Sequence, residues 1–179
     1  MVSRPRASGP AWLWAALAGR LALGGVWLVA GALKLPDPAA GVRAVRAYQL
    51  LPEAAVPAVG YGLPVVEVLL GLLLILGVTV RACAVGSALL LLAFMGGIGA
   101  AWARGLQIDC GCFGGGGQVA DGGTRYVQEL LRDAGLLAVS ALLAARPRSR
   151  LSLTGAVLGP SPAAAPTPTP VERPRSVPS

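Results

Sequence analysis

The chain has 179 residues, of which 55% are hydrophobic and 13% are charged, and its mean hydropathy is +0.67. Soluble domains carry roughly 25% charged residues, so this composition argues against a soluble domain and indicates an integral membrane protein. The net charge is +7 and histidine is absent, but the arginines are scattered beside apolar runs, which argues against a nucleic-acid-binding face. We therefore expect membrane lipid, and no nucleic acid, among its partners.

The first apolar run covers residues 11–33 and follows a basic segment, 1–10, that we expect to be flexible. The apolar region of a cleaved signal peptide usually has about 7 to 15 residues. Because this run is longer, we favour an uncleaved first membrane span over a signal peptide. Arg20 lies inside the run, and we expect its side chain to extend toward the cytoplasm.

Residues 35–60 mix prolines, charges and alanines. Between Pro38 and Pro52, the segment 39–51 predicts a short amphipathic helix at the membrane interface. Three further apolar runs predict the remaining spans, at about 63–80, 82–103 and 125–145. Small residues at 96–101 are expected to allow close helix packing.

The last segment, 147–179, repeats proline with alanine, serine and threonine and predicts a disordered tail, because such a composition cannot build a core. The predicted membrane domain therefore covers 11–146. Strand signals are weak. The expected fold is all-α: a polytopic bundle of four transmembrane helices with a short interfacial helix after the first span.

The arginine distribution predicts the orientation of these four spans. One side of the membrane carries eight basic residues, namely Arg4, Arg6, Arg81, Arg146, Arg148, Arg150, Arg173 and Arg175. The other side carries five, namely Lys34, Arg43, Arg46, Arg104 and Arg125. By the positive-inside rule both termini are cytoplasmic in a multi-pass protein of the cell membrane, and the loop after the third span is extracytoplasmic.

This loop contains the sequence Cys110-Gly111-Cys112, followed by four glycines from 114 to 117. Disulfides persist in extracytoplasmic compartments. A ring that joins residues i and i+2 needs unusual backbone angles, which Gly111 permits. Such a pair is suited to electron exchange with another dithiol, and we predict that Cys110 and Cys112 form a redox pair.

Other roles for the loop are less favoured. A structural disulfide would restrict the unfolded chain little across so short a ring. A metal site would need two further ligands. Asp109 could supply one, but the remaining cysteine, Cys83, lies at the other end of the third span, where we expect it to be a small buried residue. A phosphate-binding loop would need a Gly-Lys-Ser/Thr ending. We predict no metal, and no residue pattern identifies a cofactor, although a quinone is compatible with the site.

Charged residues inside the predicted spans are costly and usually face the bundle interior. Glu67 and Arg132 lie at similar depth beneath the cysteine loop, so we predict that they pair. We expect Asp133 to lie on an adjacent face, because neighbouring helical positions do not face each other. The pair either locks the helices together or supports the redox site and carries its protons. Asp109 should raise the pKa of Cys110, which makes Cys112 the better nucleophile.

Four segments resemble the methylamine utilisation protein MauE family, within the DoxX-like group of four-helix membrane proteins. They are "GRLALGGVWLVAGALKLPDP" (19–38), "YQLLPEAAVPAVGYGLPVVEVLLGLLLILG" (48–77), "DCGCFG" (109–114) and "LLRDAGLLAVSALLA" (130–144). The resemblance implies a role in maturation of methylamine dehydrogenase, a disulfide-rich periplasmic enzyme, beside a thioredoxin-like partner. It places Cys110, Cys112 and Glu67 at the family's motif positions.

The sequence thus predicts a membrane thiol-redox accessory protein that exchanges disulfides with an extracytoplasmic thioredoxin-fold protein. It leaves open whether the protein is itself an enzyme. A non-enzymatic membrane assembly or docking factor is the alternative. A small-solute transporter is less favoured, because the charges lie away from the middle of the membrane.

Overall fold

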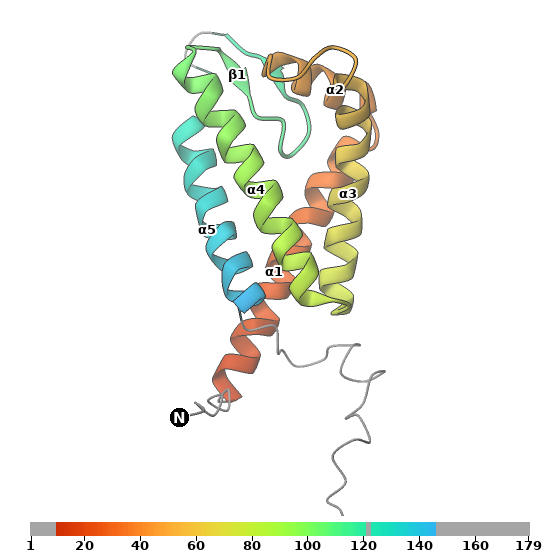
Figure 1. Ribbon diagram of the computed structural model, residues 1–179, viewed down its shortest axis with the longest axis vertical. Coiled ribbons are helices and arrows are strands. Elements are labelled where there is room, and N and C mark those ends of the chain that lie inside the picture. The colour runs from red at the N-terminus through yellow and green to blue at the C-terminus, as the bar shows by residue number, and fades with distance from the viewer. Residues whose placement is uncertain (1–9, 121–122, 146–179) are drawn as a thin grey trace, which may run out of the picture.

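The computed structural model describes residues 10–120 and 123–145. Its elements are α1 (Pro10–Lys34), α2 (Pro38–Ala47), α3 (Val56–Leu76), α4 (Val80–Ala103), β1 (Ile108–Asp109), β2 (Gly117–Gln118) and α5 (Tyr126–Ala145). The long helices α1, α3, α4 and α5 lie side by side as a bundle, which we call the shaft (Figure 1). The predicted tail, 147–179, and all but one residue of the predicted flexible segment, 1–10, lie outside the described residues.

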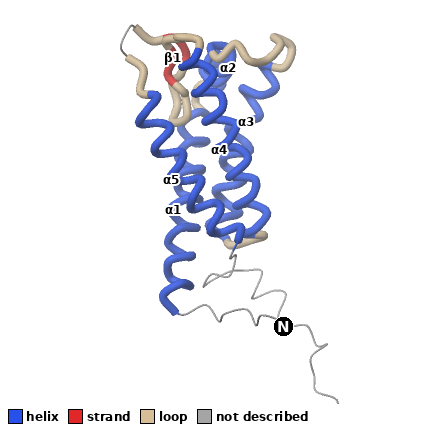
Figure 2. The backbone as a smooth tube through the Cα atoms, turned by 60° about the vertical axis from the view of Figure 1, so that its left-hand side comes forward, coloured by secondary structure: helices blue, strands red, loops and turns tan. Residues whose placement is uncertain are grey.

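The two ends of the shaft differ. α1 begins, α5 ends and α3 turns into α4 at one end (Figure 1). The opposite end carries α2, the two strands and the loop between the strands (Figures 1 and 2). This loop contains Cys110 and Cys112. We call α2 together with residues 104–120 the cap. The segments that connect the long helices therefore lie at the two ends of the shaft.

Three of the described helices, α1, α3 and α4, are long and apolar enough to cross a membrane. α5 has 20 residues but carries Glu129, Arg132 and Asp133, and it is not among those three. The helical membrane character is thus confirmed, while the count of four spans stays a prediction. α3 begins at Val56, well before the predicted start of the second span at 63. The two-stranded ribbon of β1 and β2 was not predicted.

Glycines bring α1 and α3 into close contact. A Cβ atom on Gly71 would lie 2.8 Å from the backbone oxygen of Gly24, and one on Gly31 would lie 2.8 Å from a backbone oxygen of α3. Small residues let membrane helices approach in this way. The expectation of close packing at 96–101 is wrong for Gly96 and Gly99, because a Cβ on either would meet nothing within 4 Å in the described structure.

The predicted amphipathic helix is present as α2. Asp37 caps it, because its side chain accepts a hydrogen bond from the Ala40 amide at 3.0 Å. Arg43 donates to the same carboxylate at 2.9 Å, and this hydrogen bond lowers the pKa of Asp37. A Cβ on Gly60 would lie 2.7 Å from the backbone of α2. Close contact with α3 thus holds α2 across the end of the shaft.

The shaft sorts its side chains by face. Its outer face is apolar: Leu89 is 63% exposed and Leu131 is 69% exposed. The interior contains the apolar cluster of Leu23, Trp27, Leu74, Leu91 and their neighbours. Cys83 is buried with a free thiol, as predicted. An apolar exterior is what lipid contact requires.

Charged side chains also lie inside the shaft. Arg20, Glu67 and Asp133 are each at most 1% exposed. The expectation that Arg20 extends to the cytoplasmic surface is therefore wrong, because its side chain is enclosed by the bundle. Intramembrane ionisable groups that face a bundle interior usually have a functional or structural reason to be there.

Candidate functional site

The segment from 104 to 120 is a short hairpin that carries the cysteine pair. β1 and β2 are antiparallel. The hydroxyl of Tyr126, at the start of α5, donates to the Leu106 carbonyl and accepts from the Ile108 amide at 3.3 Å. Between the strands the chain turns down into the end of the shaft (Figure 1). The hairpin thus places both cysteines against the ends of the long helices.

Cys110 and Cys112 are joined by a disulfide, and their Cα atoms are 5.4 Å apart. Gly111 between them has a φ of +68°, in the left-handed region that glycine adopts without steric cost, as the Cys-Gly-Cys spacing predicts. A Cβ on Gly111 would lie 3.0 Å from the Cβ of Ala44 and 3.2 Å from the Cα of Gly116. Glycine at position 111 therefore permits both the backbone turn of the disulfide ring and the close contact of that ring with α2.

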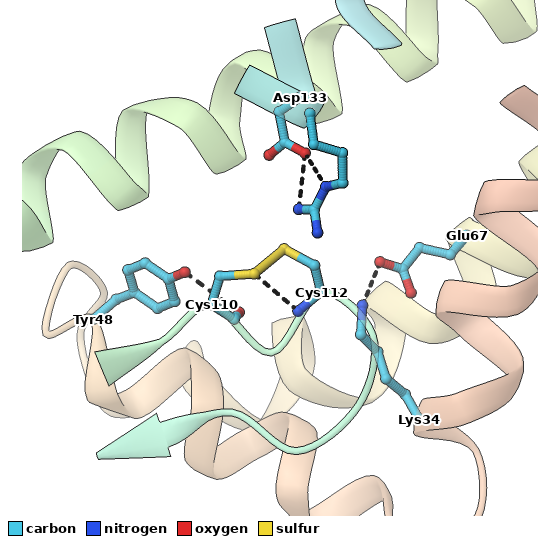
Figure 3. Close-up of a disulfide and its surroundings, with 7 residues drawn as sticks. Lys34, Tyr48, Glu67, Cys110, Cys112 and Asp133 are labelled. Atoms are coloured by element: carbon cyan, nitrogen blue, oxygen red, sulfur yellow. Dashed lines mark hydrogen bonds and ion pairs between the residues drawn. A yellow bond between two sulfur atoms is a disulfide. The ribbon is translucent and has the colours of Figure 1, made fainter. Parts of the chain in front are cut away.

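The two sulfur atoms have different surroundings. Cys110 is half-buried, whereas Cys112 is 9% exposed. The Cys112 amide donates to the Cys110 sulfur at 3.2 Å, and the Tyr48 hydroxyl donates to the Cys110 carbonyl at 3.3 Å (Figure 3). Burial raises the pKa of the Tyr48 phenol, so this donor stays protonated. Cys110 is thus the more exposed residue of the pair, and Cys112 the more buried one.

A buried ion pair lies beside the disulfide. Lys34, the last residue of α1, donates to Glu67 of α3 at 2.5 Å, and the side chains are 6% and 0% exposed (Figure 3). The predicted pairing of Glu67 with Arg132 is therefore wrong. The physical reason is that α1 packs directly on α3, so the end of α1 reaches Glu67 first.

Arg132 instead pairs with its neighbour Asp133 at 2.9 Å. The argument that adjacent helical positions are poor partners fails here because the long arginine side chain bends back to the carboxylate. Its guanidinium also lies 4.9 Å from the centre of the Phe113 ring in the cysteine loop, within the range of a cation–π contact. Arg132 therefore links α5 to the loop.

The disulfide separates two cavities of similar size and opposite character. One, of about 280 Å³, is bordered by charged and polar side chains, including Asp109, Gln128 and Arg132. The other, of about 290 Å³, is bordered mainly by apolar side chains of α2, α3 and α4. Both cysteines line both cavities, so the disulfide can be approached from either side.

A third cavity, of about 20 Å³, touches Cys112, Glu67, Arg132 and Asp133. Among the described residues, the Glu67 Oε2 and Asp133 Oδ2 atoms are buried without a hydrogen-bond partner. A space of this size holds about one water molecule, which would connect the two carboxylates. The two predicted support residues, Glu67 and Arg132, thus line a cavity that Cys112 also lines, although they do not pair with each other.

A possible metal-binding group lies on the polar side. One ligand atom each from Asp109, Cys110 and Glu129 can be placed within 4.8 Å of the others. In the disulfide form the Cys110 sulfur is not a thiolate, which is the form that binds metals. We therefore assign no metal to these residues.

Four residues of the site were not among the predicted site residues: Lys34, Tyr48, Tyr126 and Glu129. One signal was available, because Lys34 is the only lysine in a chain with fourteen arginines. The two tyrosines act through hydroxyl contacts with backbone atoms of the loop, which no sequence pattern specifies.

Fold and site together define a helical membrane protein with a disulfide at one end of its bundle. The family model described as "Methylamine utilisation protein MauE" matches residues 12–146. The chain therefore belongs to the MauE family, as the sequence resemblance indicated, and this membership fits a membrane accessory protein of methylamine utilisation. The comparisons with curated proteins and with solved structures found no match.

Proposed function

We propose that this protein is a membrane thiol–disulfide exchange protein that passes electrons between Cys110–Cys112 and a thioredoxin-fold partner outside the cytoplasm. The observation that carries the proposal is the asymmetric disulfide, in which Cys110 is half-buried and Cys112 is buried, beside a polar cavity that both cysteines line. Family membership supports maturation of the methylamine-oxidising enzyme as the setting.

The faces of α5 support a fourth membrane span. Its acidic residues point inward, with Glu129 8% and Asp133 1% exposed, while Val127, Leu131 and Leu142 are exposed. Such a helix is apolar where it would meet lipid and polar where it meets the bundle. With four spans and Arg4 and Arg6 retained in the cytoplasm, both chain ends are cytoplasmic, the cysteine pair is outside, and α2 lies at the outer interface.

In the proposed exchange, a partner thiolate attacks the Cys110 sulfur. A mixed disulfide forms, the Cys110–Cys112 bond breaks, and Cys112 leaves as a thiolate. The partner's second thiolate then attacks the partner sulfur of the mixed disulfide, which closes the partner's own disulfide and releases Cys110 as a thiolate. The partner dithiol is oxidised by two electrons, the cysteine pair is reduced by two, and the two protons of the partner pass to the pair.

Nearby charges support Cys112 as the leaving and resolving thiolate. The Lys34 amine and the Arg132 side chain each line a cavity that Cys112 also lines, and cations favour a thiolate. Glu67 and Asp133 balance these cations and lie where they can exchange a proton with Cys112. This assignment agrees with the expectation that Cys112 is the better nucleophile, and it makes Cys110 the sulfur that the partner attacks.

A trapping experiment tests the proposal. In Cys112→Ser, the Cys110 thiolate can still attack the disulfide of an oxidised partner, which is the exchange in reverse, but no Cys112 thiol is left to resolve the mixed disulfide. The partner should therefore remain attached and appear as a reducible adduct on non-reducing gels of cell membranes. Cys110→Ser is the matched control and should give far less adduct. Absence of an adduct, together with full methylamine dehydrogenase maturation in a double Cys→Ser variant, would instead favour the docking factor. A membrane-impermeant maleimide added to reduced cells should label the pair from outside.

A further inference from the structure

The apolar cavity lies on the side of the disulfide that the proposed exchange does not use. Its walls come from three helices: Val45 on α2, Val59 and Leu63 on α3, and Ala93 and Phe94 on α4. Both cysteines and the Lys34 side chain complete the lining. A well-formed apolar pocket with a few convergent polar groups is the usual form of a small-molecule site.

The mouth of this cavity lies among side chains that would face lipid. Val59 is 39% exposed, Leu50 is 50% exposed and Leu51 is 42% exposed, and all three line the cavity. Ala93 is exposed on the outer face of α4. A ligand that enters here would come from the lipid beside the outer interface rather than from water, so it should be mainly apolar.

We propose that this cavity binds the head group of an isoprenoid quinone, which accepts electrons from the reduced Cys110–Cys112 pair. This inference deepens the proposed function and rests on it. A cavity of about 150 Å³ already accommodates a benzene ring, and the volume of about 290 Å³ also leaves room for ring substituents. The open side allows the isoprenoid tail to extend into lipid.

The electron balance of this step is complete. The two thiols give up two electrons and two protons and form the Cys110–Cys112 bond. The quinone takes both electrons and both protons and leaves as the quinol. Each cycle then transfers the two electrons of one partner dithiol to one quinone, with no other reactant.

Lys34 is placed to orient the head group. Its ammonium carries three N–H donors, and one of them is used by Glu67. Because the Lys34 side chain lines the apolar cavity, a second donor can reach a quinone carbonyl oxygen. Lys34 would thereby act as a positioning residue for the acceptor, while the sulfur atoms exchange the electrons.

The test uses the purified full chain in lipid nanodiscs, reduced and freed of reductant. Short-tail ubiquinone and short-tail menaquinone analogues are added in separate arms, and quinone absorbance and free thiols are followed together. We expect one quinone reduced for each cysteine pair oxidised in at least one arm. A double Cys→Ser variant should reduce none.

Two tryptophan substitutions on α4 locate the site. Ala93→Trp fills the cavity from its exposed wall and should raise the half-saturating quinone concentration by about tenfold or more. Ala82→Trp is the matched control, because Ala82 is also exposed on α4 but does not line the cavity, and it should behave as wild type. Val59→Trp fills the same space from α3 and repeats the test if Ala93→Trp does not fold.

The outcomes separate this inference from the proposed function. Reduction of the disulfide by thioredoxin, used as the probe, without reoxidation by either quinone would overturn the quinone site and leave thiol exchange intact. Equal effects of Ala93→Trp and Ala82→Trp would also overturn it, because quinone reduction would then not depend on this cavity. A disulfide that thioredoxin cannot reduce would count against the proposed function itself.

Discussion

The shaft is stabilised by apolar side chains that repeat along four long helices, whereas the cap is stabilised by close contacts between a few individual atoms. In the shaft, Leu23, Trp27 and Leu91 belong to one buried cluster with many shared contacts. In the cap, the Cys-Gly-Cys turn touches α2 through Gly111 and Gly116. Changes of one or two atoms should therefore disturb the cap, which holds the disulfide, more than most of the shaft.

The largest effect is expected where the shaft meets the cap, at the buried Lys34–Glu67 pair. Lys34→Met leaves the Glu67 carboxylate buried without its cation, and breaking a buried ion pair costs about 3–5 kcal/mol. Thermal unfolding in detergent micelles measures this loss. The double variant Lys34→Met/Glu67→Leu removes both charges and should recover most of the stability.

An exposed pair provides the control for this prediction. Arg43 and Asp37 are 58% and 60% exposed, so Arg43→Met should have little effect on the unfolding temperature, because exposed pairs are screened by solvent. A loss in Lys34→Met no larger than that in Arg43→Met would show that the buried charge is not confined as the structure places it.

The second prediction concerns the glycine contacts of the cap. Gly116 has a φ of +85°, and a Cβ there would lie 2.7 Å from both the Gly111 Cα and the Ala44 Cβ. Gly116→Ala should therefore add a steric clash to the backbone strain, which alone costs about 1–3 kcal/mol. We expect a lower unfolding temperature and faster reduction of the disulfide by dithiothreitol.

Gly115→Ala separates strain from clash. Gly115 has a φ of +69°, but its added Cβ would come no closer than 4.0 Å to Asp109. Gly115→Ala should show the effect of backbone strain alone, so Gly116→Ala should lower the unfolding temperature clearly more than Gly115→Ala does. Equal losses in the two variants would mean that the turn is not pressed against α2.

The same contrast explains which features the sequence could predict. The three apolar helices and α2 follow from long apolar runs and from the Asp37-Pro38 start, which are local signals. The partner of Glu67 is not local: it depends on which helix packs against α3, and Gly24 and Gly31 determine that contact only once the helices are assembled.

The cap was harder to predict for a different reason. Its strands have two residues each, too few for an alternating pattern to be recognised. The Cys-Gly-Cys turn could be predicted, because Gly111 meets a local backbone requirement. The two cavities beside it could not, because their walls combine side chains from elements far apart in the sequence.

A third prediction concerns the attachment of the hairpin to α5. Tyr126→Phe removes the hydroxyl that bonds to Leu106 and Ile108, and a typical hydrogen bond contributes about 0.5–1.5 kcal/mol. Hydrogen exchange at the Ile108 amide should become faster. Tyr61→Phe is the control, since Tyr61 is 54% exposed, and it should leave that amide unchanged. Unchanged exchange in Tyr126→Phe would show that β1 is held by other contacts.

The smallest effect is expected from acid at the exposed ends of α2. Hydrogen bonds from Arg43 and Arg46 lower the pKa of Asp37 and of Glu53, respectively. A carboxylate whose pKa is lowered on folding stabilises the protein above its unfolded pKa, and this contribution is lost as the pH falls through the folded pKa. Both groups are fully exposed, so the effect should be slight and weaker still in high salt.

The measurement is hydrogen exchange of α2 amides between about pH 7 and about pH 3, a range that spans the ordinary carboxyl pKa values. Corrected for the intrinsic pH dependence of exchange, protection should fall only in the acidic part of the range. The variant Asp37→Asn/Glu53→Gln should lack this fall. If that variant loses protection as wild type does, the acid-sensitive groups lie elsewhere, and Glu67 and Asp133 in the shaft become the candidates. The comparison would then be reversed, because the shaft rather than the cap would respond to acid.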